Sequence, residues 1–98
     1  MALGIVKFWK SEQGWGAIMS DALPPGADAW VHFTAIEADG YRDLDAGDVV
    51  EFDFEVAQQD SFGHRATRVV RIGPGPAPEL RRRPDGTVEA LPPGKPSA

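Results

Sequence analysis

Residues 50–56 read Val-Glu-Phe-Asp-Phe-Glu-Val, and this stretch decides the fold class. Apolar and acidic side chains alternate along it with a period of two, the pattern of a β-strand that turns one face to a core. The rest of the chain shows no convincing helical period, apart from one turn expected near residues 34–36. Four further strands are expected between turn-rich segments, at residues 5–10, 14–20, 29–33 and 66–72. The sequence therefore predicts an all-β fold with five short strands.

The arrangement of these strands follows from their edges. A flat five-stranded sheet leaves two edge strands open to pairing with other chains, whereas a closed barrel removes them. We therefore expect a five-stranded antiparallel β-barrel. With 98 residues the chain is the size of one ordinary domain with a single modest core, and we expect a monomer.

Composition divides the chain near residue 73. Every aromatic residue precedes this point, while residues 73–98 hold seven of the nine prolines. Such a segment buries too little apolar surface to offset the entropy of ordering it. We expect a folded domain over residues 1–72 and a mostly disordered Pro/Gly-rich tail over residues 73–98. The triplet Arg81-Arg82-Arg83 in this tail is either a solubilising linker element or a weak phosphate-contacting arm.

Composition also excludes several classes of protein. The chain has no cysteine, so it forms neither a disulfide nor a thiolate metal site. With two histidines, and no carboxylate at a ligand-like spacing from His32, we expect no metal, no cofactor and no catalytic residues. The first ten residues lack the features of a signal peptide, and no run approaches the roughly 20 apolar residues that span a membrane. We expect a cytoplasmic protein that is not an enzyme.

The formal net charge of −5 bears on what the protein binds. It argues against holding duplex DNA through a broad basic surface, because such binding depends on neutralising phosphates. Base stacking on aromatic rings needs no positive charge and contributes about 1–3 kcal/mol per base. The positions of the aromatic residues therefore decide which ligand the protein takes.

Alternation on two strands brings aromatic side chains to one face. Trp15 faces away from Ile18, and Trp30 and His32 face away from Val31. If the two strands pair, a wet aromatic patch results, in which His32 stacks on a base or hydrogen-bonds to it. The glycines on both sides of Trp15 are expected to clear space above the sheet for a planar base.

Further aromatic and basic residues border this face. Phe8 lies two residues after Val6, so alternation places both on the core side of the strand. Phe8 therefore reaches the surface only if the strand bulges. Trp9 is expected on the face because three tryptophans would overfill so small a core. Phe33 is also expected there, although alternation alone would turn it inward. Lys7 and Lys10 are either phosphate contacts or ordinary solvated lysines.

Three segments together resemble the bacterial cold shock protein family. They are Gly-Ile-Val-Lys-Phe-Trp at 4–9, Ser-Glu-Gln-Gly-Trp-Gly-Ala-Ile at 11–18 and Trp-Val-His-Phe-Thr-Ala-Ile at 30–36, followed by a similar segment at 40–52. The resemblance implies the five-stranded oligonucleotide-binding barrel (OB-fold) of the cold-shock domain. It also implies binding of single-stranded DNA and RNA, often pyrimidine-rich, with the activity of an RNA chaperone or gene regulator in cold or stress adaptation.

The resemblance also implies which residues contact nucleic acid. Carried over position by position, the family's binding face falls on Lys7, Phe8, Trp9, Trp15, Asp28, Trp30, His32, Phe33 and Tyr41. Asp28 is then expected to accept a hydrogen bond from a base edge.

The sequence departs from the family pattern in four places. Phe and Trp at 8–9 reverse the usual order, Gln13 replaces a lysine, and residues 23–26 lengthen a short loop. Ala17 replaces a phenylalanine and, as an outward residue, is expected to leave one stacking platform missing. Phe62 is the expected replacement for the lost ring.

A second class of function stays open at this point. A small barrel with an aromatic groove also suits recognition of proline-rich peptides, and this chain carries its own proline-rich tail. Titration with a short oligothymidine distinguishes the two classes.

Overall fold

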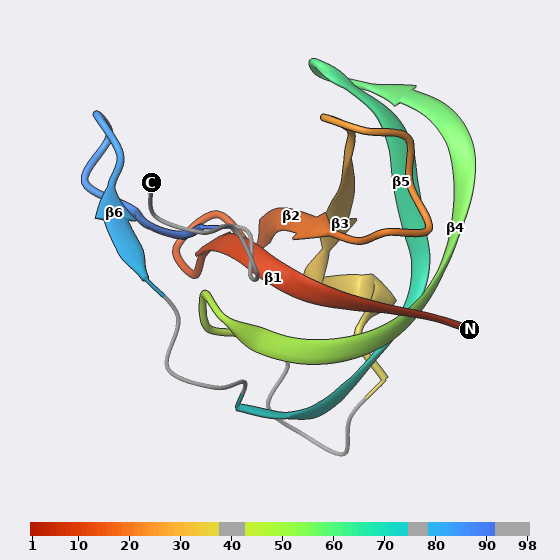
Figure 1. Cartoon of the computed structure of the whole chain (residues 1–98), viewed down its shortest axis with the longest axis horizontal. Helices are drawn as coiled ribbons and strands as arrows, with labels where there is room; N and C mark the ends of the chain where they lie inside the picture. Colours follow the sequence, from red (N-terminus) through yellow and green to blue (C-terminus); the bar gives the residue numbers. More distant parts are fainter. Residues whose placement is uncertain (38–42, 75–78, 92–98) are drawn as a thin grey trace.

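The computed structural model describes residues 1–37, 43–74 and 79–91. Its elements are β1 (Ala2–Lys10), β2 (Trp15–Met19), β3 (Asp28–His32), the 3-10 helix η1 (Phe33–Ala35), β4 (Asp48–Gln59), β5 (Phe62–Pro74), β6 (Leu80–Arg82) and β7 (Val88–Ala90). The first five strands form a closed barrel in the order β1-β2-β3-β5-β4 (Figure 1). The predicted all-β class and five-stranded barrel are confirmed. No helix within these three ranges is long and apolar enough to cross a membrane.

One strand pair departs from the predicted antiparallel pattern. The pairs β1–β2, β2–β3, β1–β4 and β4–β5 are antiparallel, but β3 and β5 run parallel, with Ala29 opposite His64 and Trp30 opposite Arg65. The reason is geometric: strand direction cannot alternate all the way around a ring with an odd number of members. A closed five-stranded barrel therefore contains at least one parallel pair.

The barrel interior is filled mainly by branched aliphatic side chains around Phe52. The largest fully buried side chains are those of Phe52, Ile18, Val6, Val31, Val50 and Val69. Along β4, the predicted inward face holds for Val50 and Phe52, which are buried. It fails at Val56, which is 84% exposed. A register shift between Asp53 and Phe54 interrupts the alternation before that residue.

A bulge in β1 changes which side chains face the core. The pairing register with β2 shifts between Val6 and Phe8, so that Val6 lies opposite Ile18 and Phe8 opposite Ala17. An extra residue in one strand reverses the in–out parity beyond it. Val6 and Trp9 consequently belong to the core cluster, and Phe8 does not.

The chain beyond residue 74 differs from the predicted disordered tail over residues 79–91. There, β6 and β7 form an antiparallel hairpin that pairs Leu80 with Ala90 and Arg82 with Val88. The hairpin lies beside the barrel against β1 (Figure 1). Ala90 is fully buried, so the hairpin gains apolar contact despite its composition. The domain boundary predicted after residue 72 falls inside β5, and residues 75–78 and 92–98 lie outside the described ranges.

Candidate nucleic-acid interface

A row of aromatic rings crosses the outer face of β1, β2 and β3. Cross-strand register places Phe8 opposite Ala17 and Ala17 opposite Trp30, while Trp15 lies opposite His32. These residues occupy positions that alternate with core residues on each strand, so their side chains share the outer face. We call the row formed by Phe8, Trp15, Trp30, His32 and Phe33 the aromatic platform.

Trp15 is the centre of the platform. Its ring meets the edge of Phe8 at 5.6 Å between centroids and stacks on Trp30 at 6.5 Å with an interplanar angle of 27°. Phe62, at the start of β5, meets Trp15 at 6.3 Å in an edge arrangement. Trp15 also donates an indole hydrogen bond of 3.0 Å to Gln13 Oε1. The predicted neighbours Trp15, Trp30 and Phe62 therefore lie together.

The far end of the platform is shaped by η1. His32 stacks on Trp30 at 5.7 Å and lies 4.6 Å from Phe33, again between ring centroids. As N-cap of η1, His32 accepts a hydrogen bond from the Thr34 backbone N–H at Nδ1, which also lies 2.8 Å from Thr34 Oγ1. The short helix ends the alternation of β3, and Phe33 is accordingly 40% exposed rather than turned inward.

Trp9 does not belong to the platform, contrary to the expectation from the sequence. It is 8% exposed, packs in the core cluster and donates its indole N–H to Asp43. The bulge before Phe8 turns one of these adjacent rings outward and the other inward. Gly16 is required by this packing, since a Cβ there would lie 2.3 Å from the Phe8 carbonyl oxygen and 2.7 Å from the Trp9 ring.

The two glycines beside Trp15 thus have roles other than the predicted clearance for a base. Gly16 makes room for Trp9 inside the barrel. Gly14 has φ of 76°, which other residues adopt only with strain. A Cβ at Gly14 would also lie 2.8 Å from the Phe33 ring, so this glycine lets Phe33 pack over the β1–β2 turn.

Ala17 lies on the outer face, as predicted, but its side chain is fully buried rather than exposed to solvent. Its cross-strand partners are Phe8 on one side and Trp30 on the other. The neighbouring rings cover the small side chain, so the space that a phenylalanine would fill is already closed.

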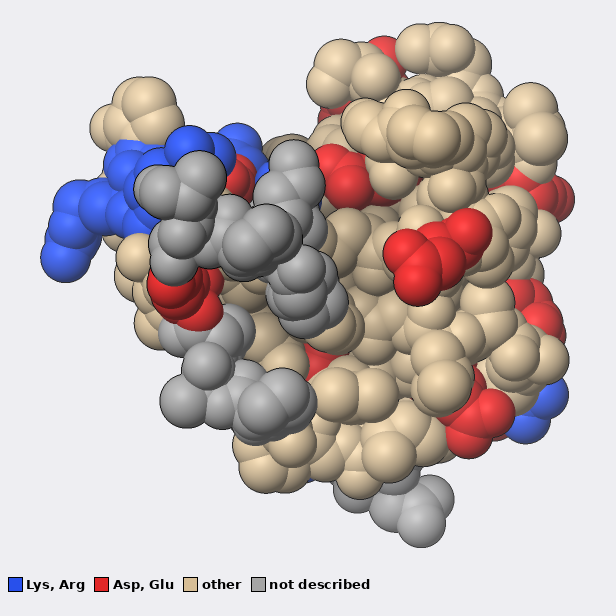
Figure 2. Space-filling model, in the orientation of Figure 1, with Lys and Arg blue, Asp and Glu red and all other residues tan. Residues whose placement is uncertain are grey.

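The basic residues beside the platform already have acidic partners. Lys7 Nζ forms an ion pair of 2.9 Å with Asp28, the residue that the resemblance implied as a hydrogen-bond acceptor for a base edge. Lys10 Nζ lies 4.8 Å from the Trp15 ring centroid and 2.8 Å from Asp85 Oδ2. In the view of Figure 2, most of the basic atoms lie over the β6 hairpin, and acidic side chains are scattered over the barrel.

Tyr41 lies outside the described residues. Within residues 1–37, 43–74 and 79–91 there is no group of three or more His, Cys, Asp and Glu residues that could hold a metal ion.

Arg83 and Asp85 reach the platform from the hairpin. Sequence reasoning named Arg83 only as part of a linker element or phosphate-contacting arm, and it missed Asp85. The Arg83 guanidinium lies over the Phe8 ring, 3.8 Å from its centroid. Lys10, followed by hydrogen bonds from Thr87, holds the pKa of Asp85 well below its usual range. The signal that could have found them is Pro84-Asp85-Gly86, a turn sequence with Gly86 at φ of 88°.

The fold and the platform together define a class of protein. A small closed barrel that carries a row of rings across three adjacent strands belongs with the OB-type barrels, whose aromatic side chains offer stacking surfaces to planar ligands. Comparison with known proteins makes the assignment specific. The "cold-shock" DNA-binding domain matches residues 2–72, and the chain belongs to this family.

Individual relatives agree with the family assignment. A cold shock-like protein CspD of Haemophilus influenzae is 40% identical over 72 residues, which cover 74% of this chain and 93% of that protein. A cold shock protein CspD of Bacillus subtilis is also 40% identical over 72 residues, and a cold shock-like protein CspLB of Listeria monocytogenes is 38% identical over 69 residues; both are covered completely. The β6–β7 hairpin lies outside the residues that match the family.

Proposed function

We propose that the protein binds single-stranded DNA and RNA by stacking bases on the aromatic platform. The observation that carries the proposal is the continuous row from Phe8 through Trp15 and Trp30 to His32 and Phe33, with centroid distances between 4.6 and 6.5 Å. Every base presents a flat π-face, so such a row accepts successive bases without requiring one sequence. Family membership supports the same function.

The target is single-stranded because the rings of the platform can stack only on bases whose faces are free. In a duplex the faces of the bases are stacked on one another, and they become available only when the strand is unpaired. Lys7 and Lys10 lie beside the platform and contact the phosphates once their present carboxylate partners are exchanged for the nucleic-acid backbone. Phe62 extends the platform on the β5 side.

The cellular role that we propose is that of an RNA chaperone or a regulator of gene expression. A protein that holds unpaired bases favours the open form of weak RNA hairpins by mass action. The names of the relatives, which refer to cold shock, support a role in adaptation to cold or stress. The proposed partners are unpaired, pyrimidine-rich segments of RNA or DNA.

Titration with a short oligothymidine tests the binding function through tryptophan fluorescence. We expect quenching of Trp15 and Trp30, which lie on the platform, while the emission of the buried Trp9 persists. The matched duplex is the control ligand, and a proline-rich peptide of the composition of the tail tests the alternative class. Equal affinity for duplex and single strand, or quenching by the peptide alone, contradicts the proposal.

A further inference from the structure

The end of the platform nearest β1 is covered by the chain's own hairpin. Phe8 faces outward, yet it is 3% exposed. Arg83 accounts for part of this burial, because its guanidinium lies over the ring at 3.8 Å from the centroid. Bases stack on aromatic rings at a similar spacing, and a guanidinium is a planar group that occupies the same place.

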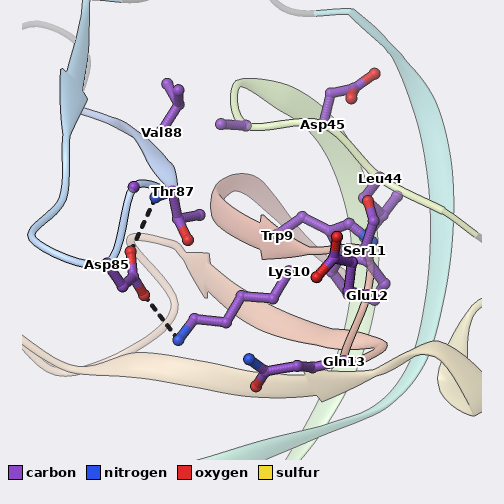
Figure 3. Close-up of a pocket in the computed structure, with 12 residues that line it drawn as sticks. Trp9, Lys10, Ser11, Glu12, Gln13, Leu44, Asp45, Asp85, Thr87 and Val88 are labelled. Atoms are coloured by element: carbon purple, nitrogen blue, oxygen red, sulfur yellow. Dashed lines mark hydrogen bonds and ion pairs between the residues drawn. The ribbon is translucent and has the colours of Figure 1, made fainter.

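The same hairpin also occupies the nearest basic side chain. Asp85 Oδ2 lies 2.8 Å from Lys10 Nζ, and Figure 3 shows this ion pair beside the hydrogen bond from the Thr87 N–H to Asp85. A carboxylate oxygen at this distance stands where a phosphate oxygen would bind the lysine. Arg83 thus occupies the position that a base would take on Phe8, and Asp85 occupies the position that a phosphate would take beside Lys10.

Ion pairs within the hairpin hold Arg83 in its docked position. Glu89, which is buried, forms ion pairs with Arg81 and Arg83 and so directs Arg83 toward the barrel. A cleft of about 550 Å³ lies between the hairpin turn and the barrel (Figure 3). The Arg83 Nε atom is buried and forms no hydrogen bond with the described residues, and it lies 3.8 Å from Asp85 Oδ1.

We infer that the β6–β7 hairpin competes with nucleic acid for the Phe8–Lys10 end of the platform and leaves it when a strand binds. This inference rests on the proposed function of the platform. An isolated two-stranded hairpin is marginally stable in water, so a displaced hairpin loses its structure as well as its position. The apparent affinity for a strand then equals the intrinsic affinity of the free platform multiplied by the fraction of molecules in which the hairpin is undocked.

The first test uses full-length Arg83→Ala, with Arg82→Ala as the matched control. Both variants remove one positive charge from the same hairpin, but Arg82 is exposed and forms no ion pair with the described residues. The loss of one positive charge should weaken binding of a polyanion by the same amount in both variants. Loss of the Arg83–Phe8 contact instead tightens binding of oligothymidine about two- to fivefold, the effect of one exposed cation–π contact on the docked fraction.

A second pair of variants tests the anion. Asp85→Asn frees Lys10. Glu79→Gln removes the same charge from an exposed side chain that forms no ion pair with the described residues. We expect Asp85→Asn to tighten oligothymidine binding about two- to fivefold, and more than Glu79→Gln does.

Amide hydrogen exchange of the unaltered protein tests displacement directly. Saturating oligothymidine should speed exchange of the hairpin amides, including Arg83 N–H, which donates to the Thr87 carbonyl at 2.8 Å. Unchanged hairpin exchange in the complex, or Arg83→Ala binding no more tightly than Arg82→Ala, overturns the inference and leaves the proposed function intact. Absence of oligothymidine binding by the parent and every variant overturns both.

Discussion

Trp9 and Trp30 show how the position of one residue type decides its role. Trp9 lies in the core and donates a hydrogen bond to Asp43, whereas Trp30 lies on the outer face between Trp15 and His32. A buried ring contributes to stability through the apolar area it removes from water and the cavity it fills. A ring on the platform offers its face to a ligand. Substitutions at the two positions should therefore affect different measurements.

Trp30→Ala should weaken oligothymidine binding by about 1–3 kcal/mol, the contribution of one stacked base. Trp9→Ala should lower the free energy of unfolding by about 3–5 kcal/mol, because it leaves a large cavity in the core. Fluorescence titration and thermal unfolding of both variants give the two values. A larger loss of stability in Trp30→Ala than in Trp9→Ala would show that the outer ring is the structural one.

Ala17 is another residue whose role depends on its surroundings in the fold. The resemblance to the family implied an outward position open to a further ring, yet Ala17 is fully buried between Phe8 and Trp30. Ala17→Phe should therefore destabilise the barrel by about 1–3 kcal/mol through overpacking, and it should weaken binding by displacing the neighbouring rings. Thermal unfolding and oligothymidine titration measure the two effects. Tighter binding at unchanged stability would show that the outer face has room for another ring.

Among the elements, β1 and the hairpin depend on one another. The bulge in β1 turns Phe8 outward, and the hairpin then places Arg83 over that ring. Without the bulge, Phe8 would face the core and the hairpin would lack this contact. The extra residue in β1 therefore creates both the first ring of the platform and the surface on which the hairpin docks.

The ion pair between the two elements has a definite pH dependence. Asp85 faces Lys10 of β1 and, within the hairpin, Arg83 and Thr87. Lys10 lowers the pKa of Asp85 from its ordinary value of 3.8. A lowered folded-state pKa means that the contact stabilises fully above the ordinary value and is lost as the pH falls through the folded one.

NMR of the Thr87 amide follows this titration, because its N–H donates to Asp85 Oδ1. We expect a midpoint well below pH 3.8 and no change in hairpin docking between pH 7 and pH 5. Asp85→Asn, which lacks the ionisable group, should give a flat profile over the same range. A midpoint at or above 3.8 would show that Lys10 does not hold the Asp85 carboxylate in solution.

At the scale of the whole molecule, acidic residues outnumber basic ones and give a net charge of −5, so the barrel cations have carboxylate partners. The Lys and Arg side chains on β1 and β5 that form ion pairs are Lys7, Lys10, Arg65, Arg68 and Arg71, and each pairs with an Asp or Glu. A strand bound to the platform must displace the carboxylates that pair with Lys7, Lys10 and Arg65 before its phosphates contact these cations. The molecule therefore gains little from the release of counterions, which gives most nucleic-acid binders their salt dependence.

Binding of oligothymidine should accordingly depend weakly on salt. Lys7, Lys10 and Arg65 are the cations of the barrel strands that lie near the platform, whereas Arg83 of the hairpin lies over Phe8 and leaves when the hairpin is displaced. Single strands give a slope of about 0.7 per phosphate neutralised. A plot of log affinity against log salt concentration should thus have a slope no steeper than about 2. A slope steeper than about 3 would indicate a larger basic surface, for example one formed by the hairpin arginines after displacement.

The sequence by itself determined the barrel and most of its outer face. Alternation along residues 50–56 and on the strands of Trp15 and Trp30 depends only on local backbone geometry, which sends successive side chains to opposite faces. That signal can be read without knowing the pairing partners. It identified the all-β class, the outward positions of Trp15, Trp30 and His32, and the inward position of Val31.

Tertiary structure alone decided the exchange of Phe8 and Trp9, the burial of Ala17 and the docking of the hairpin. A bulge is defined by the register of two strands, so the sequence of β1 alone could not show that one lies before Phe8, and hence that Phe8 turns outward and Trp9 inward. The hairpin is ordered by contacts across the fold, between Arg83 and Phe8, Lys10 and Asp85, and around Ala90. Composition reports the apolar surface that a segment carries, whereas order depends on the partners that the rest of the molecule offers it.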